Sequence, residues 1–327
     1  MTLLVTGSAG HLGEALMRHL RAAGRPAMGL DLEPSPFTDC VGSIVDRPFV
    51  RQCLAGVEHV LHTATLHKPH LVTHDHAAFL ETNVTGTLVL LEEALAAGVS
   101  AFVFTSTTSV FGAALRPPPG DPAVWVTEST EPVARNIYGV SKLAAESLCE
   151  LFARTRGLPA VVLRTSRFFP EADDDPDVRA RYDGLNVQAN ELLHRRVDIE
   201  DVVSAHLLAL ERAVALRFGR YIVSATTPFS PTDMPALGRD AAAVIRRLVP
   251  GCEALYTRHG WALPARIDRV YVNDHARADL GWRPKYDFRH VLDSLAAGHD
   301  FRSVLAREVG RKGYHGERFE DGLYPIA

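Results

Sequence analysis

A tyrosine and a lysine lie one helical turn apart, in a pattern that could perform proton transfer. Tyr138 and Lys142 begin an amphipathic stretch that predicts a helix over residues 138–156, and the spacing puts both side chains on one face. A phenol with a pKa of about 10 is a poor base, but a nearby ammonium group favours the phenolate and lowers that pKa. The same spacing also occurs by chance in ordinary surface pairs.

Hydroxyl side chains at the end of a predicted strand strengthen the chemical interpretation. The run Thr105-Ser106-Thr107-Thr108-Ser109 follows apolar residues that predict a strand over 101–105. A hydroxyl there can hold a reacting substrate oxygen by a hydrogen bond while Tyr138 moves its proton. These residues together indicate acid–base chemistry on a substrate hydroxyl group.

A glycine motif points to a dinucleotide. Gly7, Gly10 and Gly13 lie between a predicted strand, 2–6, and a predicted helix, 12–23. The glycines allow a tight turn and close approach of a pyrophosphate, to which the helix N-terminus offers N–H groups. Asp31 ends the next strand, where a carboxylate accepts hydrogen bonds from ribose hydroxyls and repels a 2′-phosphate, so NAD is favoured over NADP. The alternative is that Asp31 only caps a turn.

The elements that must position these residues alternate along the chain. Apolar runs predict strands at 2–6, 27–31, 58–64, 101–105 and 160–164, and amphipathic runs predict helices at 12–23, 75–97 and 138–156. This order predicts an α/β fold with a doubly wound, parallel Rossmann sheet.

Two long loops are expected to interrupt this order after strand ends, where ligands bind in open α/β sheets. Residues 113–136 contain too many prolines for a helix, at 117–119 and 122. Residues 168–190 contain an acidic run that is most simply a solvated loop, made of Asp173, Asp174, Asp175 and Asp177.

Composition excludes several classes of function. The 327 residues carry a net charge of −4 and form no basic stripe, so no nucleic-acid partner is expected. No apolar run reaches the roughly 18–20 residues that a membrane span needs, and no signal peptide is recognisable at the N-terminus. The four cysteines are widely spaced (Cys40, Cys53, Cys149 and Cys252), which predicts free thiols and a cytoplasmic protein.

Taken together, these residues resemble the extended short-chain dehydrogenase/reductase family, in its NAD-dependent epimerase/dehydratase group, which includes UDP-glucose 4-epimerase. The likeness covers nearly the whole chain. It also includes the segments His62-Thr63-Ala64, Asn83-Val84-Thr85-Gly86-Thr87, Arg195 to Val202, and Asp279-Leu280-Gly281-Trp282-Arg283-Pro284.

The resemblance implies a role for each matching residue. Thr107 matches the family's catalytic Ser/Thr, Tyr138 its base and Lys142 the partner of that base, while Asn83 matches a supporting residue. The implied cofactor contacts also include the glycine loop, Asp31 and an adenine segment; in full they are Gly7, Gly10, His11, Leu12, Gly13, Asp31, Ser43, Ile44, Thr63, Ala64, Thr105, Tyr138, Lys142 and Thr165. The implied substrate contacts are His67, Thr107, Thr108 and Arg167.

Some positions depart from the family pattern. His67 replaces a lysine near the nicotinamide, and Arg167 stands in a stretch that usually holds an asparagine. The guanidinium fork of Arg167 suits a carboxylate or phosphate, with an ion pair to the acidic loop as the alternative. The segment from Arg164 to Arg195 is shorter than the one that helps hold the nucleotide in relatives. A sugar, a sugar acid and a nucleotide sugar all remain open as substrates.

Five histidines within fifteen residues raise the alternative of a metal site: His62, His67, His70, His74 and His76. Pro69 interrupts any helix joining the first three, and no Cys or Glu completes a zinc spacing. We expect no metal, and expect these side chains to line the substrate mouth or face solvent.

The resulting expectation is a two-part enzyme. Residues 1–164 form the NAD-binding domain, with parts of 195–225 completing its sheet, and residues 165–197 and 220–327 mainly form the substrate lobe and C-terminal segment. A dehydrogenase and an epimerase share the first step, so both remain open. A dehydratase ranks third, because Thr108-Ser109 replaces the Asp-Glu of relatives. A non-catalytic NAD sensor is the alternative of a different class. The resemblance also implies a homodimer formed by helices 75–97 and 138–156.

Overall fold

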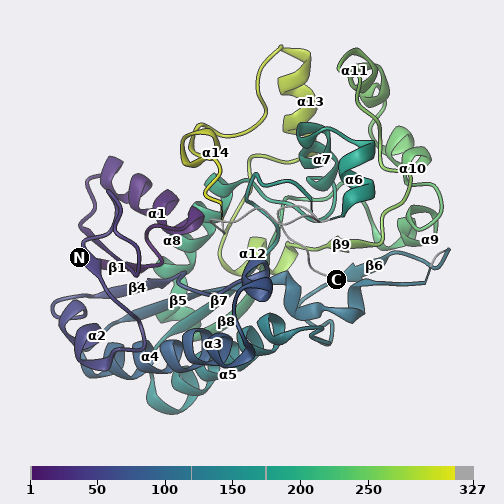
Figure 1. Ribbon diagram of the computed structural model, residues 1–327. Coiled ribbons are helices and arrows are strands. Elements are labelled where there is room, and N and C mark those ends of the chain that lie inside the picture. The colour runs from purple at the N-terminus through teal and green to yellow at the C-terminus, as the bar shows by residue number, and fades with distance from the viewer. Residues whose placement is uncertain (1, 119, 174, 314–327) are drawn as a thin grey trace.

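The central feature of the computed structural model is a parallel sheet (Figure 1). The structure describes residues 2–118, 120–173 and 175–313. Seven strands of the described chain form it: β1 (Leu3–Thr6), β2 (Ala27–Asp31), β3 (Cys40–Val41), β4 (His59–His62), β5 (Ala101–Thr107), β7 (Ala160–Thr165) and β8 (Phe218–Val223). Their order is β3-β2-β1-β4-β5-β7-β8 and every pairing is parallel. The Rossmann prediction is confirmed, and the strand order reverses between β1 and β4, where such folds bind ligands.

Helices cover both faces of this sheet. One face carries α1 (His11–Ala22), α8 (Ile199–Leu216) and α14 (Val304–Val309), and the other carries α2 (Arg47–Cys53), α4 (Gly86–Ala96) and α5 (Ile137–Arg156). Leu16 and Leu20 of α1 pack with Val202 in one core, whereas Leu90 and Cys149 belong to the core on the opposite face. Burial of one apolar stripe per helix therefore fixes which way each helix faces.

The helix expected over residues 75–97 is present as a helical run with a defect. It consists of α3 (His76–Leu80), a π turn (Glu81–Thr85) and α4. π turns within helices occur often at functional sites. This one carries Asn83, which is 2% exposed.

The loop expected over residues 113–136 is not entirely irregular, so that prediction needs correction. It contains a short 3-10 turn (Ala113–Leu115) and a strand, β6 (Val124–Val126). The strand pairs in parallel with β9 (Arg269–Tyr271) in a second, two-stranded sheet. The β-prone Val-Trp-Val segment begins after the prolines and pairs with a distant segment that no local pattern indicates.

The loop expected over residues 168–190 also needs correction, because it contains α6 (Pro176–Arg181) and α7 (Gly184–Glu191). Asp175 and Asp183 are N-caps whose carboxylates accept backbone N–H groups of these helices. Asp173 is buried rather than solvated, and Asp174 lies outside the described residues. Part of the acidic run therefore starts helices or enters the interior.

The remaining helices build a smaller C-terminal lobe beside the sheet (Figure 1). It contains α9 (Met234–Leu237), α10 (Ala241–Leu248), α11 (Cys252–Arg258) and α13 (Phe288–Ala296), packed with α7 around Leu237, Ile245 and Tyr256. Short 3-10 turns lie at Lys68–Val72, Thr108–Phe111 and Pro231–Asp233, and α12 (Asp274–Asp279) packs on β8. The lobe and the carboxyl ends of the strands enclose the functional site.

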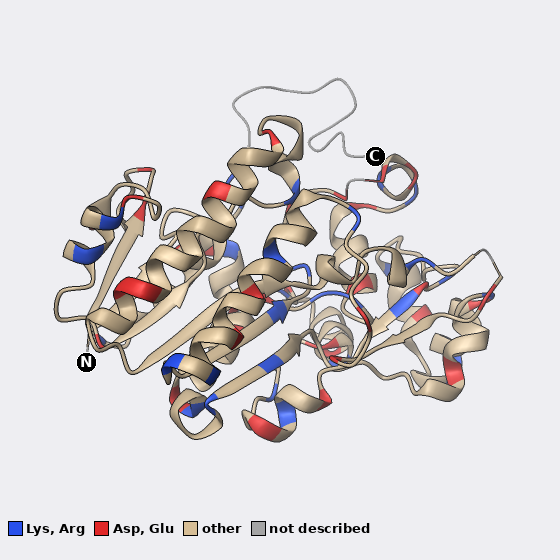
Figure 2. Ribbon diagram, turned by 90° about the horizontal axis from the view of Figure 1, so that it is seen from below, with Lys and Arg blue, Asp and Glu red and all other residues tan. Residues whose placement is uncertain are grey.

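Charged residues of both signs are interspersed over the ribbon (Figure 2). This distribution agrees with the small net charge. Among the described residues no helix is long and apolar enough to cross a membrane. The four cysteines have free thiols.

Candidate active site

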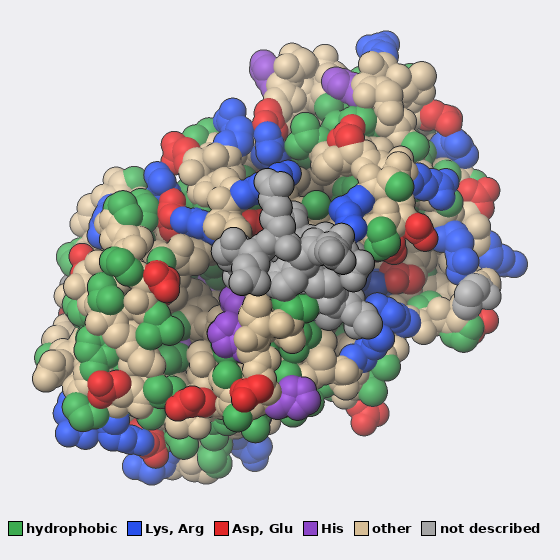
Figure 3. Space-filling model, in the orientation of Figure 1, with side chains coloured by type: hydrophobic (Ala, Val, Ile, Leu, Met, Phe, Trp, Pro, Cys, Tyr) green, Lys and Arg blue, Asp and Glu red, His purple; other side chains and the backbone are tan. Residues whose placement is uncertain are grey.

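A cavity of about 710 Å³ lies over the carboxyl ends of the strands and reaches the C-terminal lobe. Figure 3 shows this face, with histidine side chains close to where the domain and the lobe meet. The cavity brings together the expected site residues, and only Lys142 is missing from its lining. The lining includes Gly7, Gly10, His11, Leu12, Gly13, Asp31, Ser43, Ile44, Thr63, Ala64, His67, Thr105, Thr107, Thr108, Tyr138, Thr165 and Arg167.

The glycine loop packs too closely on its surroundings for larger residues. Gly7 has φ +73°, and a Cβ atom there would lie 2.7 Å from the Ala64 nitrogen. At Gly13 a Cβ atom would lie 1.9 Å from the Gly7 carbonyl oxygen. The loop leads directly into α1, whose first N–H groups suit an anion. The cradle therefore fits the pyrophosphate of NAD.

A buried hydrogen-bond chain fixes this loop against β4. The Thr6 hydroxyl oxygen accepts the backbone N–H groups of Thr63 and Ala64, each at 3.2 Å. His62 Nδ1 lies 2.7 Å from Thr6 Oγ1, and His62 Nε2 lies 3.0 Å from Thr87 Oγ1. Burial holds the pKa of His62 well below its usual value. The neutral His62 ring is thus a structural bridge within the cofactor end of the site.

The adenosine end of the cavity carries a carboxylate at the end of β2. Asp31 accepts the N–H of Ala9 at 2.9 Å and the N–H of Glu33 at 3.0 Å. Asp31 therefore also stabilises the turn, which was the alternative to a ribose contact. It lines the same cavity as Ser43 and Ile44. An acceptor here suits the ribose hydroxyls of NAD and repels the 2′-phosphate of NADP.

Tyr138 is positioned by the first turn of α5. The Asn136 side chain caps this helix by accepting the Gly139 N–H at 3.1 Å. Tyr138 is 7% exposed and Thr107 9%. Burial raises the pKa of Tyr138 to about 12, opposed by a hydrogen bond from the Thr107 side chain. The phenol and the hydroxyl expected to act together are therefore in contact.

Lys142 lies behind the cavity wall rather than in it. Its ammonium donates to the Thr105 carbonyl at 2.6 Å and sits 4.0 Å from the centre of the Phe104 ring. Burial lowers the pKa of Lys142 to about 7, opposed by the nearby Glu146 carboxylate. In this conformation Lys142 contacts the strand that carries Thr107.

Asn83 joins three parts of the site. Its side-chain oxygen accepts the Leu66 N–H at 2.8 Å and the Thr65 hydroxyl at 2.9 Å. Its amide group donates to the Leu66 carbonyl at 2.8 Å and to Ser141 Oγ at 2.9 Å. The residue ties the segment before His67 to the helix that carries Tyr138, which is the supporting position the resemblance implies.

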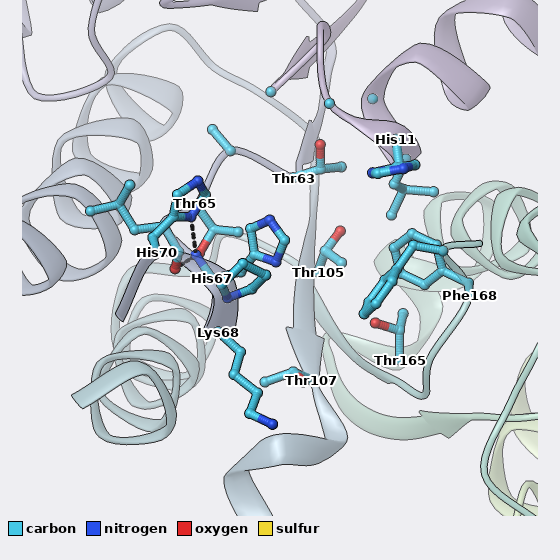
Figure 4. Close-up of a pocket in the computed structure, with 18 of the residues that line it drawn as sticks. His11, Thr63, Thr65, His67, Lys68, His70, Thr105, Thr107, Thr165 and Phe168 are labelled. Carbon is cyan, nitrogen blue, oxygen red and sulfur yellow. Dashed lines mark hydrogen bonds between the residues drawn. The ribbon is translucent and has the colours of Figure 1, made fainter. Parts of the chain in front are cut away.

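Two threonines expected to contact the cofactor use their hydroxyl groups within the protein. Thr105 Oγ1 lies 2.8 Å from His206 Nε2, and His206 Nδ1 lies 2.8 Å from the Val202 carbonyl. A proton on Nδ1 serves that carbonyl, so the Thr105 hydroxyl donates to Nε2. Thr165 donates to the Ser106 carbonyl at 3.0 Å. Both residues still line the cavity (Figure 4).

Arg167 makes the ion pair that was the alternative to substrate binding. Its guanidinium lies 3.0 Å from Asp173 and also donates to the Glu171 and Ala172 carbonyls at 2.9 and 2.8 Å. Arg195 joins the same cluster, 3.1 Å from Asp173 and 2.9 Å from Glu191. Burial would raise the pKa of Glu191, but Arg196, Arg167 and Arg195 hold it at about 2. These groups form a fixed charged wall.

Several cavity residues were not predicted as site residues: Lys68, Phe168, Phe169, Glu191, Arg195, Arg269, Tyr271 and Lys312. Lys68 directly follows His67, and Figure 4 shows its side chain running toward Thr107. Arg195 lies within a motif that the resemblance includes. Arg269 and Lys312 come from remote segments, and only the folded chain brings them to the cavity.

The histidines form pairs rather than a ligand set. His70 Nδ1 accepts the His67 backbone N–H at 3.0 Å, and the two rings meet edge to face. Among the residues the structure describes, no group of three or more His, Cys, Asp or Glu side chains is placed to hold a metal ion. His67 and His70 line the cavity.

Comparison with known proteins identifies the family. The profile of the NAD dependent epimerase/dehydratase family matches residues 3–225. The chain is 27% identical to a UDP-glucose 4-epimerase of Rhizobium meliloti, over 92% of this chain and 98% of that protein. It is 30% identical to a dTDP-glucose 4,6-dehydratase of Streptomyces antibioticus, over 88% of this chain and 89% of that protein.

Solved structures agree with this assignment. A short-chain dehydrogenase/reductase superfamily protein from Agrobacterium tumefaciens, solved with bound NAD, superposes with a TM-score of 0.65. It is 25% identical, with 94% of this chain and 97% of that one covered. The chain is an enzyme of the NAD-dependent epimerase/dehydratase family, built on the short-chain dehydrogenase/reductase fold.

Proposed function

We propose that this enzyme oxidises a hydroxyl carbon of the sugar in a nucleotide sugar and then returns the hydride, so that the product is an epimer. The observation that carries the proposal is the contact between Tyr138 and Thr107 in a buried corner of the cavity that also contains the glycine loop. The named relatives support a nucleotide-sugar substrate.

The chain's own groups divide the proton chemistry between them. Thr107 holds the reacting substrate oxygen, and Tyr138 takes the proton from it. When bound, NAD would supply the hydride acceptor and a positive charge. Burial favours the protonated phenol. Positive charge at the cofactor and at Lys142 opposes that preference and makes Tyr138 a usable base.

The substrate end of the cavity is suited to an anionic ligand. Three guanidinium groups line this end of the cavity, of Arg167, Arg195 and Arg269, together with one carboxylate, of Glu191. The excess positive charge and the nearby Lys68 favour a diphosphate or carboxylate. His67 and Thr108 are proposed to contact the sugar, with Arg167 acting mainly through the wall that it stabilises.

A dehydratase is less well supported. The residues after Thr107 are Thr108 and Ser109, neither of which is an acid. The acidic side chain in the described cavity lining nearest the substrate end, Glu191, is held ionised by three arginines. A carboxylate held in this way is a poor general acid.

We also infer a homodimer in the cytoplasm. Val140 and Leu151 of α5 are about half exposed and lie three helical turns apart on one face. Leu80 of α3 is exposed as well. Apolar positions on adjacent helices support pairing into a four-helix bundle. The free thiols support a reducing compartment.

The role of Tyr138 is tested by Tyr138→Phe, which keeps the ring and removes the proton-transfer group. Turnover should fall by about 10²–10⁴-fold, while the dissociation constant for NAD, measured by calorimetry, stays within about twofold. Tyr182→Phe, outside the cavity lining, is the matched control and should keep full activity. Unchanged turnover in Tyr138→Phe would contradict the proposed chemistry. A wild type that binds NAD but converts no sugar would instead support the sensor.

A further inference from the structure

Contacts that the hydride-transfer chemistry does not use hold one wall of the cofactor end of the cavity. His11 is the first residue of α1, lies within the glycine loop and is only 6% exposed. Its Nε2 atom lies 2.9 Å from Oε1 of Glu171, which is 4% exposed. His11 begins α1 and Glu171 lies in the segment after β7, so this contact joins two segments that are far apart in the sequence.

Aromatic packing accompanies the contact. Phe168 and Phe169 precede Glu171 and line the cavity together with His11. The His11 and Phe169 rings are 6.3 Å apart, and the Arg167 guanidinium lies 5.1 Å from the Phe169 ring centre. Figure 4 shows His11 and Phe168 on the same side of the cavity, across from His67. The segment 168–171 is therefore held at both its aromatic and its acidic residues.

A third segment joins the same contacts. The Lys312 backbone N–H donates to Glu171 Oε1 at 3.1 Å, and the Lys312 ammonium pairs with Glu14 of α1. Lys312 and Gly313 also line the cavity. Glu171 thus joins the first turn of α1 to the chain near residue 312, beside the loop where the pyrophosphate binds.

We propose that His11 and Glu171 form a clasp that retains NAD between catalytic cycles. With its pyrophosphate on the glycine loop, the dinucleotide would leave when segment 168–171 moves away from His11. Hydrogen bonds that involve an ionised group are stronger than neutral ones. NAD release is therefore slow, because this contact must first be broken. Glu171 acts through His11 and is a positioning residue.

Retention matters for the choice of reaction, and this step rests on the proposed function. An epimerase uses the same cofactor molecule for oxidation and return of the hydride, so early release of the reduced cofactor would strand an oxidised sugar. A dehydrogenase must instead exchange its cofactor in every turnover. A clasp beside the pyrophosphate therefore favours the epimerase over the dehydrogenase.

Electrostatic repulsion predicts a change in the rate of NAD release of the opposite sign. Glu171 brings a negative charge close to the site of an anionic pyrophosphate, and repulsion alone would weaken NAD binding. Removal of the charge would then slow NAD release. The direction of the change separates the clasp from simple repulsion.

The test measures release of radiolabelled NAD from pre-loaded protein after addition of excess unlabelled NAD. Glu171→Gln and His11→Phe should each release NAD at least about tenfold faster than the wild type. Glu171→Asp keeps the charge but shortens the side chain, and should also release faster. Because the two residues act as one contact, the double variant His11→Phe/Glu171→Gln should be little faster than either single variant. Glu211→Gln, on an exposed position of α8, is the matched control and should be unchanged.

Melting temperatures separate loss of the clasp from loss of the fold. Faster release in Glu171→Asp, with melting within a few degrees of the wild type, would support the clasp. Unchanged or slower release in both Glu171 variants would overturn it, whatever sugar the enzyme converts. Fast release from the variants of a protein that acts on no sugar would leave the clasp standing and overturn the proposed function.

Discussion

At the scale of single residues, the chemistry depends on how burial changes two ionisable groups. Burial raises the pKa of Tyr138 to about 12 and lowers that of Lys142 to about 7. Both shifts favour the neutral forms, so burial alone would leave both side chains uncharged. In the proposed mechanism, positive charge from NAD and from Lys142 would make the phenolate accessible.

The pH dependence of turnover should report this balance. Tyr138 must lose a proton to act as the base, so turnover should rise with pH, and it should level off as Lys142 itself loses its proton above a pH of about 7. Lys142→Met removes the stabilising charge and should move the rising limb at least about one pH unit higher.

The pH profiles of turnover of the two proteins are measured with saturating NAD. Lys285→Met, at an exposed lysine outside the cavity lining, serves as the control. Superimposable profiles for wild type and Lys142→Met would contradict the role of Lys142 in activating Tyr138.

The site residues could be predicted more completely for the cofactor end of the cavity than for its substrate end. Gly7, Gly13 and Asp31 lie in one local strand–turn–helix unit, so their spacing alone indicates their function. Arg269 and Lys312 reach the cavity only through the tertiary fold. Arg167 shows why a residue type does not decide a role, because the same guanidinium suits a substrate anion and the Asp173 carboxylate.

At the scale of elements, the site depends on how α5 is held against the segment after β4. Asn83 makes four side-chain hydrogen bonds from the π turn, to Thr65, to both backbone groups of Leu66 and to Ser141. A π turn widens the helix locally and aims this amide inward. The π turn in the helical run therefore helps to position the site residues.

Asn83→Ala should lower both turnover and stability. Loss of these bonds removes the partner of the half-buried Leu66 N–H, which costs about 1–3 kcal/mol in the free energy of unfolding. Turnover should fall about tenfold or more as His67 and Tyr138 lose their alignment, while NAD affinity changes little. Glu81→Gln, exposed in the same π turn, is the control.

Denaturant unfolding and steady-state kinetics of both variants measure these effects. A stable Asn83→Ala enzyme with full turnover would show that Asn83 does not organise the site.

The hydrophobic periodicity of the sequence predicted the elements of the sheet domain. It did not predict the short elements that begin at a cap. The strands β1, β4, β5 and β7 and the helix α5 lie within a few residues of their expected ranges. In contrast, α6 and α7 are short and begin at Asp caps within an acidic stretch. β6 is three residues long and depends on its pairing with β9.

At the scale of the whole molecule, an apolar face on α3 and α5 remains exposed. Its exposed members Leu80, Val140 and Leu151 are 44–50% exposed. We expect a second copy of the chain to cover them, because large apolar side chains on adjacent helices favour self-association.

The double variant Val140→Asp/Leu151→Asp should therefore be a monomer under conditions where the wild type sediments as a dimer. Val214→Asp, on the exposed side of α8, should leave the dimer intact. A wild type that sediments as a monomer at micromolar concentration would contradict the homodimer.

The products formed from a nucleotide sugar distinguish an epimerase from a dehydrogenase. The purified enzyme is incubated with NAD and a panel of free sugars, sugar acids and UDP- and dTDP-sugars, while absorbance follows NADH and NMR and mass spectrometry identify products. We expect a nucleotide sugar to be converted to its epimer with no net NADH and no change in mass. Stoichiometric NADH from a free sugar or sugar acid, with the nucleotide sugars unchanged, would contradict it and make the enzyme a dehydrogenase.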